Sequence, residues 1–365
     1  MSHEEAHLDL SASLPEPYIT DDLPGIGGNI KKRPEHFVVQ ELPLYEATGD
    51  GAHIYVCVTR DGWTTRALQQ RLAALFSLQT VDVGYAGLKD KQARVTQVFS
   101  LCLPNTDERS VHERIESELP LQVACVRRHR NKLKPGHLLG NRFQIVVSHP
   151  VAEALERSDT VIAALHHRGI PNFYGVQRFG VTGENAQRGR EILLGAEQRD
   201  RWLRRFLLSA YQSALFNAWL SARIRQGWFQ QVMLGDVAKK TQTGGLFEVA
   251  DVATDTMRFA RNEITITGPI YGSKMWWASD APGKLEHSIL EHSGITVEML
   301  GRASLKGTRR PARLVLESLV VLPHPEGVEL RFDLPKGAYA TTVLREFIKA
   351  DLTVCEDGTW TGEND

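Results

Sequence analysis

The two ends of the chain carry strand patterns, and the middle carries helix patterns. Near the start, apolar Ile54, Val56 and Val58 alternate with other side chains, as in a strand with one buried face. The alternation returns at 328–332, after a middle in which apolar residues recur at helical spacing over 202–224. A sheet assembled from both ends of a chain requires the residues between them to leave the sheet and return. The pattern therefore predicts an α+β protein in which one sheet domain is interrupted by an insertion.

We place the ends of the insertion near residues 169 and 320. The first 25 residues are polar and punctuated by proline, so they are expected to form a mobile lead-in. The predicted parts are 1–25 for the lead-in, 26–168 with 320–365 for the sheet domain, and 169–319 for the insertion. Strands are predicted at 37–42, 54–59, 81–87, 95–103, 121–126, 143–147, 264–266, 314–322 and 328–332. Helices are predicted after a cap at Thr64 or Thr65, and at 152–167, 184–194, 202–224 and 339–349.

The net charge of the chain excludes no class of partner. The 365 residues include 43 Lys and Arg and 44 Asp and Glu, a formal net charge of −1. Residues 1–25 hold six acids and no Lys or Arg, so the remaining residues carry +5, since −1 less −6 is +5. The cations are clustered, and clusters of this kind are candidates for contact with phosphate groups. They lie at 31–33, 127–134, 201–205 and 309–310.

Neither a membrane nor a metal is indicated. No apolar run reaches the roughly 18 residues that a membrane span needs. The N-terminus lacks the basic and then apolar pattern of a signal peptide, so we expect a cytoplasmic protein. The string His3-Glu-Glu-Ala-His7 has the spacing of a zinc-binding helix. It lies at a charged terminus with little apolar face, and we therefore expect no metal there.

The stretch 84–97, Gly-Tyr-Ala-Gly-Leu-Lys-Asp-Lys-Gln-Ala-Arg-Val-Thr-Gln, joins two predicted strands. Gly84 and Gly87 allow the backbone to turn or to approach a ligand closely. Asp90 follows in a positive local field, between two lysines. Taken alone, an aspartate between lysines is typical of a solvated surface. The wider string changes that interpretation.

This string resembles the catalytic motif of the TruD family of tRNA pseudouridine synthases, and four further blocks resemble the same family. They are Lys-Lys-Arg-Pro-Glu-His-Phe-Val-Val-Gln-Glu at 31–41, Arg-Asn-Lys-Leu-Lys-Pro-Gly-His-Leu-Leu-Gly-Asn-Arg-Phe at 130–143, Pro-Asn-Phe-Tyr-Gly-Val-Gln-Arg-Phe-Gly at 171–180, and Leu-Pro-Lys-Gly-Ala-Tyr-Ala-Thr-Thr-Val-Leu-Arg-Glu at 334–346. Five blocks in this order make the resemblance specific.

The resemblance implies a fold and a reaction. The fold is a pseudouridine-synthase-like catalytic domain with a mixed, mainly antiparallel sheet flanked by helices, interrupted by an α/β insertion domain. The reaction is the isomerisation of uridine to pseudouridine in tRNA, in this family at position 13, with no cofactor and no metal. The expected partner is tRNA, and the resemblance implies neither a membrane nor an obligate protein partner.

The resemblance also assigns roles to residues. Asp90 is the expected catalytic carboxylate, acting as a nucleophile at the sugar or base or as a base at C2′, and the sequence does not choose among these. Lys31 is expected to neutralise Asp90, with Arg345 in reserve. Phe143 is expected to form a wall for an everted uracil, and Asn141 to hydrogen-bond the uracil edge or orient the loop. Phosphate contacts are expected from Lys89, Arg130, Lys132, Lys134, Arg178 and Arg345.

Two alternatives stay open at the level of sequence. One is a tRNA-binding or remodelling protein without chemistry, which would gain nothing from a carboxylate beside phosphates. The other is a metal-dependent nuclease, which would need clustered carboxylates, and the sequence shows no such cluster around Asp90.

Overall fold

The computed structural model describes residues 16–180, 183–349, 351–354 and 360–363. The chain divides into two compact units, each of which joins segments far apart in the sequence. The sheet unit consists of Pro24–Ile162, Leu316–Gly337 and the described residues from Phe347 onward. The helical unit consists of the described residues up to Leu23, Ala163–Val315 and Ala338–Glu346.

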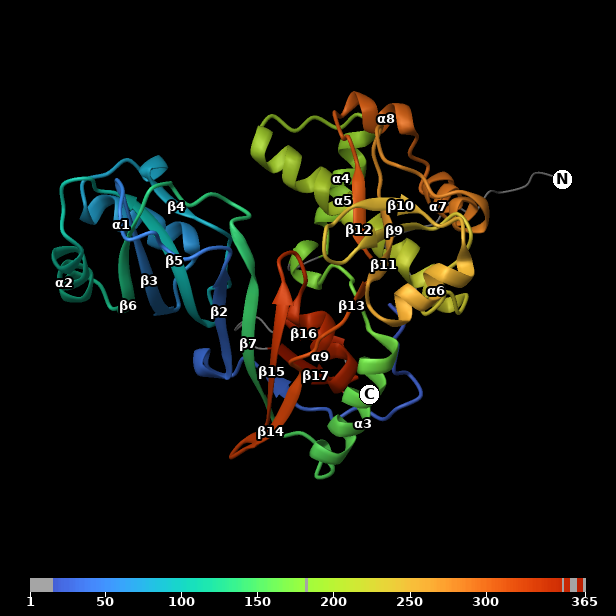
Figure 1. Ribbon diagram of the computed structural model, residues 1–365, viewed down its shortest axis with the longest axis horizontal. Helices are drawn as coiled ribbons and strands as arrows, with labels where there is room; N and C mark the ends of the chain where they lie inside the picture. The colour runs from blue at the N-terminus through green and yellow to red at the C-terminus, as the bar shows by residue number, and fades with distance from the viewer. Residues whose placement is uncertain (1–15, 181–182, 350, 355–359, 364–365) are drawn as a thin grey trace. The chain divides into compact units, whose positions relative to one another are not determined.

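The sheet unit is built on one large sheet. Its strands are β1 (Asn29–Ile30), β2 (Phe37–Pro43), β3 (His53–Asp61), β4 (Val83–Tyr85), β5 (Arg94–Cys102), β6 (Gln122–His129), β7 (Leu138–Ser148), β14 (Val320–His324), β15 (Gly327–Pro335), β16 (Asp351–Val354) and β17 (Trp360–Glu363). The main path runs β16-β17-β1-β7-β2-β5-β3-β6, with β15 also paired to β7, β14 to β15 and β4 to β5 (Figure 1). Among the described pairs, β2 with β5 is parallel and the rest are antiparallel. The predicted α+β class with a mixed, mainly antiparallel sheet is confirmed.

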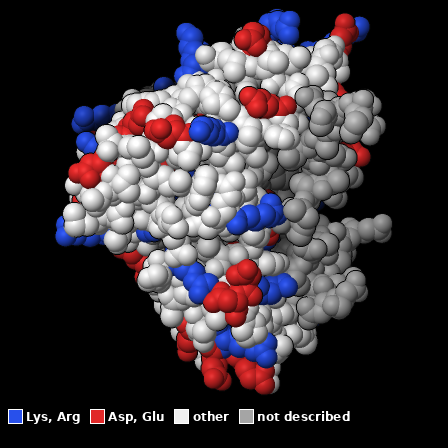
Figure 2. Space-filling model, turned by 90° about the vertical axis from the view of Figure 1, so that its right-hand side faces the viewer, with Lys and Arg blue, Asp and Glu red and all other residues white. Residues whose placement is uncertain are grey.

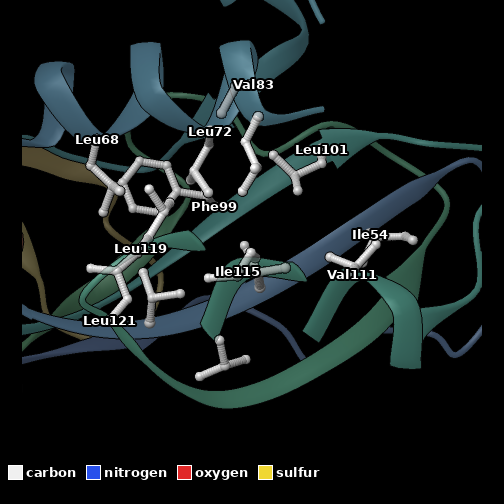
Figure 3. Packing of buried hydrophobic residues seen from close by; sticks show 14 of the residues in the cluster. Ile54, Leu68, Leu72, Val83, Phe99, Leu101, Val111, Ile115, Leu119 and Leu121 are labelled. Carbon is white, nitrogen blue, oxygen red and sulfur yellow. The ribbon is translucent and has the colours of Figure 1, made fainter. Parts of the chain in front are cut away.

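Helices α1 (Thr65–Leu75) and α2 (Glu108–Glu118) close the core of this sheet. The first begins where the sequence predicts, because Thr64 Oγ1 accepts a hydrogen bond from a backbone N–H of the first turn. Its buried Leu68 and Leu72 pack over Phe99 of β5 (Figure 3). Removing these side chains from water is the main stabilising contribution. The cluster thereby fixes α1 against β5, the strand that follows the connection 86–93.

In the helical unit a long helix packs on a small sheet. The helix α5 (Arg201–Arg225) contacts β11 (Ile264–Ile270) where the Trp219 side chain is buried. Gly268 of β11 has no room for a side chain, since a Cβ there would lie 2.2 Å from the Trp219 ring. The small sheet has the order β10 (Leu246–Glu248), β9 (Val237–Lys240), β11 and β12 (Thr308–Pro311), and β8 (Ile170–Pro171) pairs with β13 (Arg313–Leu314). The other helices are α4 (Asn185–Leu193), α6 (Val252–Ala260), α7 (Asp280–His292), α8 (Val297–Arg302) and most of α9 (Ala340–Ile348), while α3 (Ala154–Arg168) crosses from one unit to the other.

Residues 16–23 are packed, so the expectation of a mobile lead-in is wrong for this part of the chain. Thr20 donates its backbone N–H and its hydroxyl to the Glu346 carboxylate, and it is fully buried. Arg168 donates to Asp22 at 2.7 Å. The sequence pattern missed these contacts because the partners lie 326 and 146 residues away. Residues 1–15, including the His3 to His7 string, lie outside the described residues.

On the face that Figure 2 shows, basic and acidic side chains are interspersed, in keeping with a net charge of −1. Within the described residues, no helix combines the length and the apolar character that crossing a bilayer requires.

Candidate active site

The connection 86–93, between β4 and β5, carries Asp90 and is anchored at two points. Gln97 of β5 donates its side-chain N–H to the Gly87 carbonyl oxygen at 2.6 Å. The backbone N–H of Lys89 donates to Thr65 Oγ1, at the start of α1, at 2.9 Å. Because both anchors belong to elements of the hydrophobic core, the connection has a fixed path from Gly87 to Lys89, directly before Asp90. The helix and strand that pack together thus hold Asp90 in place.

Lys31 and Asp90 form an ion pair. Lys31 Nζ lies 2.7 Å from Asp90 Oδ2, with the lysine side chain 3% exposed and the aspartate side chain 41% exposed. The lysine follows β1 with a φ of 61°, in the left-handed region that a non-glycine residue rarely adopts. Strain of this kind persists only where surrounding structure enforces it. The geometry thus presents a carboxylate held from one side by a buried cation and open on the other.

One aromatic ring contacts this pair directly, and two more rings pack behind it. Lys31 Nζ is 4.4 Å from the centroid of the Phe37 ring. Phe143 meets Phe37 edge to face at 6.1 Å between centroids, and stacks on Phe332 at 5.5 Å. The rings come from β2, β7 and β15, where Phe143 pairs directly with Phe332. This alignment brings two of the matched blocks, 31–41 and 130–143, together with Phe332 of β15.

The alignment of β7 with β15 depends on Gly140. A Cβ at this position would lie 2.0 Å from the Leu334 carbonyl oxygen. The glycine in the Gly-Asn-Arg-Phe string therefore allows the close approach of β15, which sets the register of Asn141 and Phe143.

Lys89 points into the protein. Its ammonium lies 3.0 Å from Glu41 Oε2, and both side chains are 5% exposed or less. The same ammonium donates a hydrogen bond to Asn141 Oδ1. Burial lowers the pKa of the Lys89 ammonium, while the charge and hydrogen bond of Glu41 raise it. The predicted phosphate contact of Lys89 is at odds with this burial. The contact of Asn141 with Lys89 fits the second of its two predicted roles, orienting the loop.

Arg60, Thr65 and Gln97 form a buried network behind the connection. The Arg60 guanidinium donates to Thr65 Oγ1 and to Gln97 Oε1, both at 3.1 Å, and its residue is 1% exposed. Burial lowers the pKa of Arg60 to about 10, and the charge of Glu41 opposes that shift. Arg60 therefore remains charged at neutral pH. Its charge fixes the two side chains that anchor Gly87 and Lys89.

Comparisons with known proteins agree over most of the chain. The family model described as tRNA pseudouridine synthase D (TruD) matches residues 15–199 and 195–347. A tRNA pseudouridine synthase D from Anaeromyxobacter sp. (strain Fw109-5) is 43% identical over 349 residues, which are 93% of this chain and 98% of that protein. One from Thermus thermophilus is 39% identical over 336 residues, 92% of each.

The chain belongs to the TruD family. The crystal structure of a Methanosarcina mazei protein assigned to TruD superposes with a TM-score of 0.74 at 25% identity, covering 96% of this chain and 99% of that one. The two-unit, mixed-sheet architecture is therefore that of a TruD protein.

The other cations predicted to contact RNA have varied surroundings in this TruD protein. Lys134 is exposed, and Arg130 is exposed and paired with Asp50 at 2.9 Å. Lys132 donates to a backbone carbonyl oxygen. Arg178 binds the hydroxyls of two serines of α5. Arg345 donates to the backbone carbonyls of residues 16 and 17 and lies 4.3 Å from the Tyr18 ring. The preferred partner of Asp90, Lys31, forms the predicted ion pair, and Arg345 stays the reserve candidate.

Several residues of the site escaped sequence reasoning. Glu41 and Gln97 lie inside the matched blocks, so the resemblance marked their positions without giving them roles. The sequence around Arg60 shows only a charged residue at the end of an apolar strand, which does not indicate a role in the site. Its role depends on partners brought together only by the fold. Among the described residues there is no group of three or more His, Cys, Asp or Glu side chains arranged to hold a metal ion.

Proposed function

We propose that Asp90 is the catalytic carboxylate with which this TruD protein isomerises uridine at position 13 of tRNA. The chain is a tRNA pseudouridine synthase by its family, so it converts uridine to pseudouridine in tRNA. The observation that carries the proposal is the ion pair of half-exposed Asp90 with buried Lys31, beside the aromatic cluster of Phe37, Phe143 and Phe332.

The chemistry explains why a fixed carboxylate is needed. The N1–C1′ bond of uridine must break, the uracil must turn while held, and C5 must bond to C1′ before the C5 proton leaves. If an Asp90 oxygen attacks C1′, the electron pair of the broken bond goes to uracil N1, and the later attack of C5 on C1′ releases the carboxylate. Attack at C6 or removal of the C2′ proton uses the same oxygen, and the proposal covers all three routes.

Lys31 orients the reacting carboxylate. Its ammonium is buried and lies over the Phe37 ring, so it is a poor phosphate ligand. A charge fixed in a dry site acts more strongly than one in water. We therefore assign Lys31 to turnover rather than to RNA affinity.

The aromatic cluster holds the everted base. A uridine must leave its stack before an enzyme can reach its glycosidic bond, and an aromatic wall offsets the loss of stacking. Phe143 is 7% exposed and lies between Phe37 and Phe332. Its small exposed edge faces the base, and the two neighbouring rings keep it in position.

The sheet unit is the catalytic domain in this proposal, and the helical unit is the family's insertion domain. The enzyme works where tRNA is found, in the cytoplasm. A binding protein without chemistry has no use for the Lys31–Asp90 pair, and none of the comparisons favours that alternative.

The experiment that tests the proposal maps pseudouridine in tRNA by carbodiimide treatment and primer extension. Wild-type protein should place a new stop at position 13, in the presence of a chelator as well as without it. Asp90→Asn should bind tRNA and give no stop. The matched control is Asp61→Asn, because Asp61 is 40% exposed and also paired with a cation, Arg94 at 2.7 Å. A stop produced by Asp90→Asn at the wild-type level would refute the assignment.

A further inference from the structure

A hollow of about 570 Å³ in the helical unit is lined by five cations. Arg201, Arg204 and Arg205 come from the first two turns of α5. Arg302, at the end of α8, and Lys306, in the turn before β12, complete the set. Among the described residues that line the hollow there is no Asp or Glu. We call it the cationic groove.

The groove has a rigid floor. Leu208 of α5 is buried and lines the hollow, as does Ile270 of β11. The turn that carries Lys306 is tied to residues 273 and 274 by backbone hydrogen bonds of 2.9 and 2.8 Å. Its Gly307 lies so close to Gly272 that a Cβ on Gly272 would be 2.1 Å from the Gly307 nitrogen. The cations therefore stand on a preformed surface.

The position of the arginines is costly for α5. The N-terminus of a helix carries a positive partial charge, and cations there are unfavourable. Arg201 and Arg205 are exposed, and Arg204 is half-buried. Asp200 caps the helix by accepting the Leu203 N–H at 2.8 Å, which relieves part of this field. These arginines repel one another and weaken the helix that carries them. An anion bound between them would offset that cost.

We propose that the cationic groove binds backbone phosphates of the tRNA substrate, away from the nucleotide that reacts. This inference rests on the proposed function. Five cations around one open hollow provide enough positive charge for several phosphates, whereas one small anion would leave most of that charge unneutralised. Trp202 adds to the match, since it is 54% exposed and stacks on Phe206 at 5.5 Å, next in sequence to Arg201. Exposed aromatic faces beside a basic groove are typical of surfaces that also stack unpaired bases.

The groove acts in affinity and not in chemistry. Each phosphate contact that is lost should reduce the slope of log affinity against log salt by about 0.7 to 0.9. The triple variant Arg201→Gln, Arg205→Gln, Arg302→Gln should thus lower that slope by about 2 to 3 and weaken tRNA binding about tenfold or more at low salt. With enzyme in excess over tRNA at saturating concentration, the variant should form pseudouridine at the wild-type rate. Its melting temperature should change little, because two cations leave the N-terminus of α5 and one leaves the C-terminus of α8, and these changes have opposite effects on helix stability.

The matched control removes three exposed cations elsewhere on the helical unit, with Lys240→Gln, Arg261→Gln, Lys284→Gln. This variant should keep the wild-type salt slope. Equal losses in both triple variants would overturn the proposal, because the effect would then be one of net charge. Inorganic pyrophosphate serves as the probe for a small anion. If the groove variant loses pyrophosphate binding and keeps wild-type tRNA affinity, the groove is a small-anion site and the proposal is wrong.

The two proposals fail in different ways. If wild-type protein forms no pseudouridine in tRNA, the proposed function fails. If wild type is active and the groove variant binds tRNA with the wild-type affinity and salt slope, only the groove assignment fails.

Discussion

At the scale of residues, the proposed site has one half-exposed carboxylate with buried charged groups behind it. Asp90 is half-exposed, while Lys31, Glu41, Lys89 and Arg60 are buried. Buried charges are tolerated when each has a partner of opposite sign or good hydrogen bonds. The resemblance indicated Asp90, Lys31, Phe143 and Asn141. The sequence did not predict the buried network behind them. Arg60 and Gln97 become partners only because their strands, β3 and β5, pair in the folded sheet.

Lys31→Met should cost turnover far more than affinity. The substitution keeps much of the apolar stem and removes the charge that orients Asp90, so turnover on bound tRNA should fall about a hundredfold or more. The dissociation constant for tRNA should change little, because the ammonium is 3% exposed and faces Asp90. The control is Lys32→Met, since Lys32 is exposed. A loss of affinity with normal turnover would contradict this role for Lys31.

Gln97 is a positioning residue, and two substitutions separate its contacts. Gln97→Leu leaves Arg60 and Thr65 short of a partner, and should lower the free energy of unfolding by about 1–3 kcal/mol. Gln97→Glu keeps the oxygen for Arg60 but has no N–H for the Gly87 carbonyl. Stability should thus recover in Gln97→Glu while turnover stays low with KM for tRNA unchanged. Urea unfolding and steady-state kinetics give both quantities, and full activity of the glutamate variant would exclude the role.

At the scale of elements, helices with a strong apolar periodicity were predicted correctly from the sequence, and elements with a weak periodicity were not. α5 was predicted within one residue at each end, and α1 begins at the predicted cap, because the apolar faces of both helices are continuous. α2 was missed, since only Val111 and Ile115 of its eleven residues are buried. The single strand predicted over 314–322 is divided in the structure between β13 and β14. An apolar run does not reveal which of two sheets its residues join.

Gly140→Ala should disturb the pairing of β7 with β15. Because a Cβ would meet the Leu334 carbonyl at 2.0 Å, the strands must separate, and overpacking of this kind costs about 1–3 kcal/mol. Activity should fall as well, since the register of Phe143 depends on this pair. Gly301→Ala is the control: it lies in α8, where the nearest contact would be 3.5 Å, and should be neutral or stabilising by about 0.5–1 kcal/mol. Thermal unfolding compares the two variants. Equal melting temperatures would show that the pairing of β7 with β15 does not require glycine at position 140.

At the scale of the whole molecule, the interrupted pattern of the sequence has a counterpart in the two units. The insertion was inferred from strand patterns at both ends of the chain. The sequence did not predict that residues 16–23 and 338–346 belong to the helical unit. They join it through contacts of Glu346 and Arg345 with residues near the start of the chain. Such contacts between distant segments leave no periodic signal. The cationic groove, by contrast, has part of its lining in the 201–205 cluster that the sequence displays.

The central claim is that the Asp90 carboxylate does the chemistry while other groups bind and position the RNA. The most direct test is a single-turnover reaction with enzyme in excess over tRNA labelled with tritium at uridine C5, because bond formation at C5 releases that hydrogen. Wild type and Asp61→Asn should release the label from position 13 completely. Asp90→Asn, at a concentration where it binds all the tRNA, should release none. Release by Asp90→Asn at the wild-type rate would contradict the account.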